Sequence, residues 1–191
     1  FIKGNFINKT VIAGGPHVKH YKDECVKQRF DYIVPHDGLR SMIKILKGEA
    51  TDRVVSDFIP VNEYAKVWTK PNRLDNVDFL KEFNYTLKGR NSTTMLTAQW
   101  CPMVCPFCED ALTTVRWTPM DKIKEELDDI VSLGYKGVYI FDDLFAIAMP
   151  KVKPICEELK KRDLIYRCNG QANFFTKWGE DMAKMLSDTG C

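Results

Sequence analysis

Apolar and polar positions follow the order strand, helix, strand, helix over the first fifty residues. Apolar runs at 10–13 and 31–34 predict two short strands, and the segment 21–29 between them predicts a short helix. From 39 to 47, apolar residues recur on one face at helical spacing, and Gly48 follows as a stop signal. Strands that alternate with helices in this way pair in parallel.

The same alternation occurs three times between residues 93 and 191. The predicted strands span 93–100, 137–141 and 164–168, and the predicted helices span 118–134, 150–161 and 178–186. Thr118 suits the N-cap of the first of these helices, with Pro119 at its first position. Residues 50–92, in contrast, contain two prolines and few periodic runs. They predict a linker with one short helix near 77–83.

Residues suited to binding a cofactor follow each predicted strand of the second half. A cysteine-rich loop at 101–108 follows the first strand, Asp142-Asp143 follows the second, and Asn169-Gly170-Gln171 follows the third. The carboxyl ends of parallel strands share one rim in βα barrels, and that rim carries the chemistry of such enzymes. We therefore expect all three segments at one rim.

Composition narrows the class of protein. The chain has 191 residues with 45% hydrophobic and 12% aromatic content, which indicates a folded globular protein. Its net charge of +2 gives no indication of a nucleic-acid or anionic-membrane partner. No apolar run reaches the ~20 residues of a membrane helix, and the start lacks the order of a secretory signal. We expect a cytoplasmic protein, and a fragment trimmed at both ends.

The cysteine-rich loop has the spacing C-x-x-x-C-x-x-C, with candidate ligands Cys101, Cys105 and Cys108. Thiolates are soft ligands that suit an iron–sulfur cluster or zinc. A tetrahedral zinc site or an all-cysteine cluster needs a fourth ligand, whereas a four-iron cluster with three ligands leaves one iron open for a substrate or cofactor. The alternatives are a structural zinc site completed by Cys156 or Cys168, or plain buried thiols.

The chain has seven cysteines in all, an odd number. This fits metal ligation in a reducing compartment better than a secreted disulfide framework. We expect the four cysteines outside the loop to be packed thiols rather than ligands. They are Cys25, Cys156, Cys168 and Cys191.

The cysteine loop resembles the signature of radical S-adenosylmethionine (SAM) enzymes, in which an aromatic residue such as Phe107 precedes the third cysteine. The runs at 10–17 and 30–34 are similar to the cobalamin-binding domain of the subfamily that fuses such a domain to the radical SAM core. The stretch 139–145 is also similar to that subfamily. One departure is the segment 35–38, where the subfamily usually has a Gly-Glu pair after its strand.

The resemblance implies an α/β fold with three parts. Residues 1–49 would be the C-terminal part of a Rossmann-like cobalamin-binding domain, and residues 50–92 a linker. Residues 93–191 would form the first three βα units of a radical SAM partial TIM barrel. The segment that carries a histidine ligand to cobalt in some relatives is not in this sequence, so no histidine, His17 included, is assigned that role.

The resemblance also implies the cofactors. Cys101, Cys105 and Cys108 would hold a 4Fe–4S cluster whose open iron takes the amino and carboxylate groups of SAM. An electron from the cluster would then cleave SAM to a 5′-deoxyadenosyl radical or, with cobalamin, support methyl transfer. Asp142 or Asp143 would accept hydrogen bonds from the SAM ammonium group. Strand alternation points the two carboxylates to opposite faces, so we expect only one to do this.

Four further residues are candidates for cofactor contacts under the same resemblance. Asn169 and Gln171 would bond the carboxylate or ribose of SAM, and Gly14 and Gly15 would let the backbone approach the nucleotide tail of cobalamin. Their structural alternatives are an ordinary turn for the glycines and a helix cap or solvated loop for the acidic pair. The implied partners are an electron donor such as flavodoxin or ferredoxin and a small-molecule or peptide substrate. No catalytic side chain is assigned.

Two other functions compete with a cobalamin-dependent methyltransferase. One is a radical SAM enzyme of another reaction type, such as a cyclase or a methylthiotransferase. Methylthiolating relatives carry further cysteine ligands in a different N-terminal domain, and residues 1–50 offer only Cys25. The other is a non-enzymatic zinc or iron–sulfur binding module.

Overall fold

The computed structural model describes residues 8–73, 86–108 and 113–191. It divides into two compact units, residues 1–63 with 107–109 and residues 64–106 with 110–191, and each is described by itself. The boundary between residues 63 and 64 falls inside the predicted linker. The short helix predicted near 77–83 lies outside the described residues.

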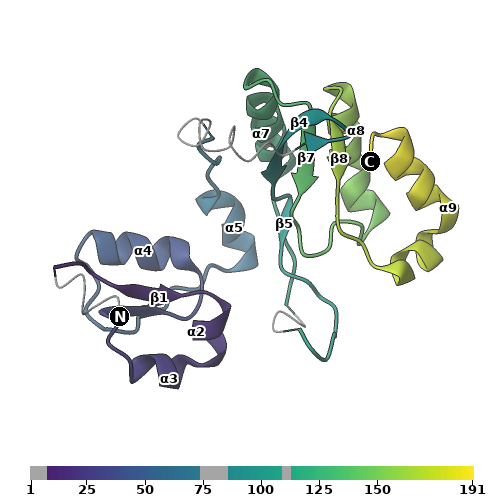
Figure 1. Cartoon of the computed structure of the whole chain (residues 1–191). Coiled ribbons are helices and arrows are strands. Elements are labelled where there is room, and N and C mark those ends of the chain that lie inside the picture. The colour runs from purple at the N-terminus through teal and green to yellow at the C-terminus, as the bar shows by residue number, and fades with distance from the viewer. Residues whose placement is uncertain (1–7, 74–85, 109–112) are drawn as a thin grey trace. The chain divides into compact units, whose positions relative to one another are not determined.

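The first unit contains a small parallel sheet (Figure 1). Strand β1 (Ile12–Gly14) pairs in parallel with β2 (Tyr32–Val34), as the sequence predicted. A parallel bridge from Ile33 to Val54 extends the pairing beyond β2. The two strands therefore form the centre of this unit.

Helices pack on both faces of this sheet because neighbouring residues of β2 point to opposite sides. Ile33 packs with Val18 of α2 (Pro16–His20) and Cys25 of α3 (Lys22–Val26). On the other side, Val34 packs with Ile45 of α4 (Gly38–Leu46). The sequence predicted α4, and α3 lies wholly within the predicted helix 21–29, but no helix was predicted for the residues of α2.

The second unit contains a four-stranded sheet in the order β3-β4-β7-β8 (Figure 1). Strands β4 (Arg90–Met95), β7 (Gly137–Ile140) and β8 (Ile165–Arg167) are parallel neighbours, which confirms the predicted pairing. Strand β3 (Thr86–Leu87) precedes them and forms an antiparallel hairpin with β4. The hairpin was not predicted.

Three helices follow these strands in turn. They are α7 (Met120–Ser132), α8 (Met149–Lys161) and α9 (Ala172–Asp188), and each contributes to one hydrophobic core with β4, β7 and β8. The prediction that Thr118 caps α7 is wrong, because the helix begins at Met120 with Pro119 at its N-cap position. Helix α9 begins six residues earlier than predicted and bends at Gly179, whose φ is 58°.

One short helix, α5 (Val61–Val67), contains residues of both units. None of the helices in the described ranges has the length and apolar content that crossing a membrane requires.

Candidate functional site

The cysteine loop leaves the sheet at a break in the predicted strand 93–100. Strand β4 ends at Met95, and β5 (Ala98–Gln99) continues in another direction to pair antiparallel with β6 (Arg116–Trp117). The pairing closes the base of the loop, since the two strands flank it in the sequence. The loop is therefore an excursion from the carboxyl end of β4.

Thr113 closes the loop further. Its hydroxyl oxygen accepts a hydrogen bond from the backbone N–H of Cys101 at 3.1 Å and donates one to the Cys101 carbonyl at 3.0 Å. The N–H of Thr113 donates to the same carbonyl at 3.2 Å. These three bonds fix the backbone of the first cysteine.

A buried arginine supports the residue before that cysteine. The guanidinium carbon of Arg116 lies 3.6 Å from the centroid of the Trp100 ring and 5.8 Å from that of Tyr64. Trp100 has a φ of 71°, a left-handed conformation that is unusual for a bulky side chain. Stacking of a planar guanidinium on an indole is favourable when it is desolvated, and Arg116 is only 1% exposed. The stack therefore stabilises the strained turn that leads into Cys101.

The two acidic residues after β7 hold the start of the cysteine loop from different sides. Asp142 is buried and accepts a hydrogen bond from the N–H of Thr97 at 2.6 Å and another from the Thr97 hydroxyl. Burial raises the pKa of the Asp142 carboxyl to about 6, although the bonds from Thr97 oppose the rise. Asp143 is exposed and accepts a hydrogen bond from the N–H of Trp100 at 3.0 Å.

Asn169, after β8, connects two loops of the same edge. Its side-chain N–H donates to the Asp142 carbonyl at 3.2 Å, and its own carbonyl accepts from the N–H of Phe145 at 3.1 Å. Its side-chain oxygen lies 3.5 Å from the Tyr139 hydroxyl. Asn169 therefore ties the connection after β8 to the connection after β7.

Gln171 brings the third segment to the cysteine loop. Its side-chain N–H donates to the sulfur of Cys105 across 3.7 Å. The other end of the amide, Oε1, is buried and has no hydrogen-bond partner among the described residues. A buried acceptor without a partner is costly, so this atom is suited to a donor from a bound group.

The three candidate ligands themselves are free thiols. Cys101 and Cys105 are partly buried and belong to the second unit, whereas Cys108 is exposed and belongs to the first. Across the described ranges, no three side chains of Cys, His, Asp or Glu gather as a metal site would require. Ligation by the trio therefore stays a prediction. Its donor chemistry, three thiols free of disulfides and the buried, unpartnered amide oxygen of Gln171, whose other end contacts Cys105, fits an iron–sulfur cluster with an adjacent cofactor.

The zinc alternative has no fourth ligand in place within these ranges. The thiol of Cys156 is buried, receives a hydrogen bond from the Tyr166 hydroxyl at 3.1 Å, and has a pKa raised by burial to about 11. The thiol of Cys168 faces that of Cys191. Each of these two thiols therefore already has a side-chain partner of its own.

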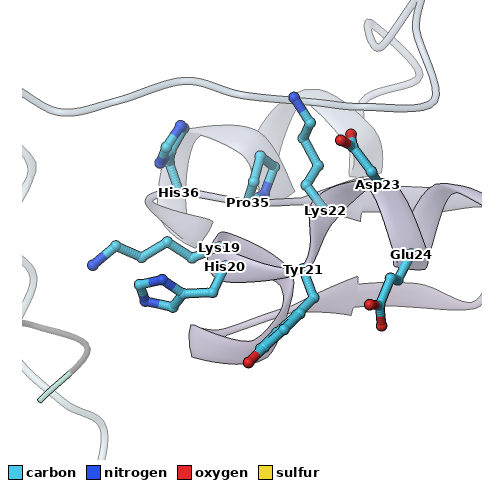
Figure 2. Close-up of a pocket in the computed structure, with 8 residues that line it drawn as sticks. All are labelled: Lys19, His20, Tyr21, Lys22, Asp23, Glu24, Pro35 and His36. Atoms are coloured by element: carbon cyan, nitrogen blue, oxygen red, sulfur yellow. The ribbon is translucent and has the colours of Figure 1, made fainter. Parts of the chain in front are cut away.

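The first unit carries a separate polar pocket of about 440 Å³, shown in Figure 2. Its lining comes from residues 19–24 of the α2–α3 segment and from Pro35 and His36 after β2. The lining mixes lysines with acidic residues, so it has no dominant charge. The pocket lies beyond the carboxyl end of β2, the edge at which parallel sheets commonly bind ligands.

The two candidate glycines lie before this segment. Gly15 has a φ of 90°, which explains the need for glycine without any ligand. A side chain at Gly14 would meet only ordinary contacts, the nearest being the Val34 carbonyl at 3.5 Å. Contact of either glycine with cobalamin stays a prediction.

No protein-family model matches the chain, and no curated protein matches it significantly. Among solved structures, the chain is similar to the radical S-adenosylmethionine methyltransferase TsrM from Kitasatospora setae. The structure of TsrM with tryptophan substrate and the SAM analogue aza-SAM matches at 16% identity and a TM-score of 0.66, over 95% of this chain and 40% of that one. A structure of TsrM with cobalamin and a [4Fe-4S] cluster matches at 17% identity and a TM-score of 0.47, over 58% and 22%.

This likeness concerns the fold. The mixed α/β arrangement is compatible with that of a radical SAM and cobalamin protein, and this chain spans less than half the length of the TsrM chain. The finer division into a cobalamin-binding part, a linker and a barrel part is not tested by it.

Several residues that shape this edge were missed in the sequence. Thr97, Thr113 and Arg116 hold the base of the cysteine loop through the contacts described above. Thr97 gave no distinct signal for the break, because the predicted strand 93–100 already contains Thr93, Thr94 and Gln99. Arg116 had none, because its partner Trp100 is 16 positions earlier in the sequence.

Proposed function

We propose that the chain is part of a radical SAM enzyme that uses a 4Fe–4S cluster to cleave SAM and cobalamin to transfer a methyl group. The observation that carries this proposal is the position of the cysteine motif. A C-x-x-x-C-x-x-C loop follows the carboxyl end of the first parallel strand, in a fold similar to that of TsrM at a TM-score of 0.66. Neither the motif nor the fold alone would be as specific.

Cys101, Cys105 and Cys108 would hold the cluster, with one iron open to SAM. When bound, the cluster would supply the electron for reductive cleavage of SAM, and cobalamin would supply methyl-transfer chemistry. The protein's part is to aim the thiols. The hydrogen bonds between Thr113 and Cys101 and the stack of Arg116 on Trp100 hold the backbone that orients the Cys101 thiol.

Among the residues proposed to contact SAM, Asp143 and Gln171 are supported best. Asp142 uses both of its oxygens on Thr97, whereas Asp143 is exposed beside Trp100. An exposed carboxylate next to the loop can accept hydrogen bonds from an ammonium group. Gln171 has a buried acceptor free next to Cys105, and Asn169 would act mainly by ordering the loops around them.

Substrate and partners belong to the same proposal. TsrM was solved with tryptophan as its substrate. For this chain we propose only a small molecule or peptide as substrate, and a reduced flavodoxin or ferredoxin as electron donor.

Replacement of one ligand tests the proposal directly. After anaerobic reconstitution with iron and sulfide, we expect Cys105→Ala to lose cluster assembly and SAM cleavage almost completely, since the two remaining thiolates are too few to hold a 4Fe–4S cluster. The matched control is Cys25→Ala, which removes a buried thiol of the first unit and should leave both intact. Iron content, absorbance and the paramagnetic signal with and without SAM are the measurements.

Two results would contradict the proposal. Full iron content and activity in Cys105→Ala would remove the ligand assignment. Stoichiometric zinc, with no spectroscopic response to SAM in the reconstituted wild type, would favour the non-enzymatic module instead.

A further inference from the structure

Two cysteines outside the cysteine loop face each other just past the carboxyl end of β8. The sulfur of Cys168, the first residue after β8, lies 4.0 Å from the sulfur of Cys191, three residues after the end of α9. A disulfide bond requires about 2 Å between the sulfurs. The two sulfurs are therefore about 2 Å farther apart than in a closed bond.

Backbone hydrogen bonds hold the two cysteines close to each other. The carbonyl of Gly190 accepts a hydrogen bond from the N–H of Tyr166 at 2.9 Å, and the N–H of Cys191 donates to the Leu186 carbonyl at 3.0 Å. Gly190 has a φ of 103°, and a side chain there would come within 3.1 Å of the Leu164 carbonyl. The segment that carries Cys191 is thus packed closely along β8, next to Cys168.

We propose that Cys168 and Cys191 are a redox-active thiol pair that closes reversibly into a disulfide. This proposal stands independently of the proposed function, because it uses neither the cluster nor SAM. The bond would link β8 to the end of α9. It would also fix the residue directly before Asn169, whose side chain ties together the loops of the candidate site.

The chemistry is a thiol–disulfide exchange with a small-molecule disulfide as the oxidant. The Cys191 thiolate attacks one sulfur of that disulfide and releases its other half as a thiolate. The Cys168 thiol then loses its proton and attacks the Cys191 sulfur, which releases the second half. In total the protein loses two hydrogen atoms, and one small disulfide becomes two thiols.

The surroundings favour Cys191 as the attacking group. The S–H of Cys168 as donor, together with the charge of Lys88, lowers the pKa of Cys191 to about 7, and the same bond raises the pKa of Cys168. Cys191 is also exposed. An accessible thiol whose pKa lies near the ambient pH is well suited to attack a disulfide.

Peptide mapping tests the bond. The full chain with its cluster reconstituted is treated at neutral pH with oxidised glutathione, alkylated and digested with trypsin. Cleavage after Arg167, Lys177 and Lys184 places the two cysteines in different peptides. We expect the peptide that starts at Cys168 to be linked to the one that starts at Met185, and dithiothreitol to separate them. The linked product should be absent from Cys191→Ser, whereas Cys25→Ser should form it fully.

Alkylation rates provide a second test that needs no disulfide. The rate at which iodoacetamide alkylates Cys191 should rise with pH and reach half of its maximum near pH 7. At neutral pH this rate should be at least tenfold higher than that of the buried Cys156, whose pKa is about 11. Cys168→Ala should move the midpoint upward because the donor is lost. Cys168→Ser, which keeps a donor, should restore a lower midpoint.

Either of two outcomes would overturn the proposal. One is oxidation in which Cys168 or Cys191 pairs only with glutathione or with the cysteines of the 101–108 loop. The other is a midpoint for Cys191 that is unchanged in both Cys168 variants, which would show that the two thiols do not interact in solution.

Discussion

The surroundings of the Asp142 carboxyl group shift its pKa in opposite directions. Loss of hydration raises its pKa to about 6, while hydrogen bonds from Thr97 favour the charged form and limit the rise. The loss of hydration is the larger effect because the side chain is 1% exposed. The charge therefore costs stability, although the hydrogen bonds define where the cysteine loop begins.

The pH dependence of unfolding tests this balance. The pKa of Asp142 is higher in the folded than in the unfolded chain, so its contribution to stability is complete below about pH 4 and is lost as the pH rises through about 6. Over that window the free energy of unfolding should fall by roughly 2–3 kcal/mol from this group. Asp142→Asn should remove this component of the profile, as followed by urea unfolding.

Ile123→Val is the control, because it shortens a buried apolar side chain without changing any titratable group and should keep the wild-type slope. A slope between pH 4 and 6 that is the same in wild type and in Asp142→Asn would show that the buried carboxyl does not control it.

Strands β4 and β7 pack tightly at Gly137. Its register partner is Ser92 of β4, and a methyl group at Gly137 would lie 2.2 Å from the Ser92 hydroxyl oxygen and 3.2 Å from its Cβ. The hydroxyl cannot simply rotate away at no cost. It accepts from the N–H of Leu87 at 3.1 Å and donates to the Arg90 carbonyl at 2.8 Å, which stabilises the β3–β4 hairpin.

We expect Gly137→Ala to lower the free energy of unfolding of the second unit by about 1–3 kcal/mol, as overpacking does in cores. In the background of Ser92→Ala the same change should cost less, because the closest atom is gone and only the contact with Cβ remains. Gly38→Ala is the matched control, since nothing lies within 4 Å of a side chain at that position. Equal costs of Gly137→Ala in both backgrounds would contradict the contact.

The hydrophobic pattern predicted the parallel strands and the helices that follow them because those signals are local. It missed the β3–β4 hairpin for a physical reason. Lys88 and Gly89 in its turn both have positive φ, of 48° and 76°, and lysine is not a residue that indicates such a turn. It also treated residues 50–92 as a linker, whereas Arg73 is buried and bonded to the Thr94 carbonyl and to Glu126. Contacts over 53 positions leave no local pattern.

In the candidate site too, features that are local in the sequence could be predicted, and contacts that the fold creates could not. The spacing of the three cysteines and the polar residues after each strand were legible in the sequence, and the structure brings Gln171 to Cys105. The distinct environments of Asp142 and Asp143 depend on Thr97 and Trp100, which only the fold places beside them. Alternation along a strand predicts that two neighbours differ, but not which one is buried.

The two units of the chain have separate hydrophobic cores. The first unit has two small apolar clusters, one around Ile33 and one around Val34 on the opposite face of the sheet, and the second unit has one larger core around β4, β7, β8 and their helices. All four tryptophans, at 68, 100, 117 and 178, belong to the second unit. Tryptophan fluorescence therefore reports the second unit alone, while circular dichroism reports both.

This separation predicts the result of one substitution in each core. Ile33→Ala removes a side chain that is 0% exposed and should destabilise the first unit by about 2–5 kcal/mol. Circular dichroism should then show an additional unfolding transition at lower denaturant concentration than in the wild type. The transition followed by tryptophan fluorescence should not move. Val138→Ala, at an equally buried position of β7, should move the fluorescence transition instead. If Ile33→Ala shifted both signals together by the same amount, the cores would unfold as one cooperative structure, since two independent cores cannot transmit the loss of one side chain in full.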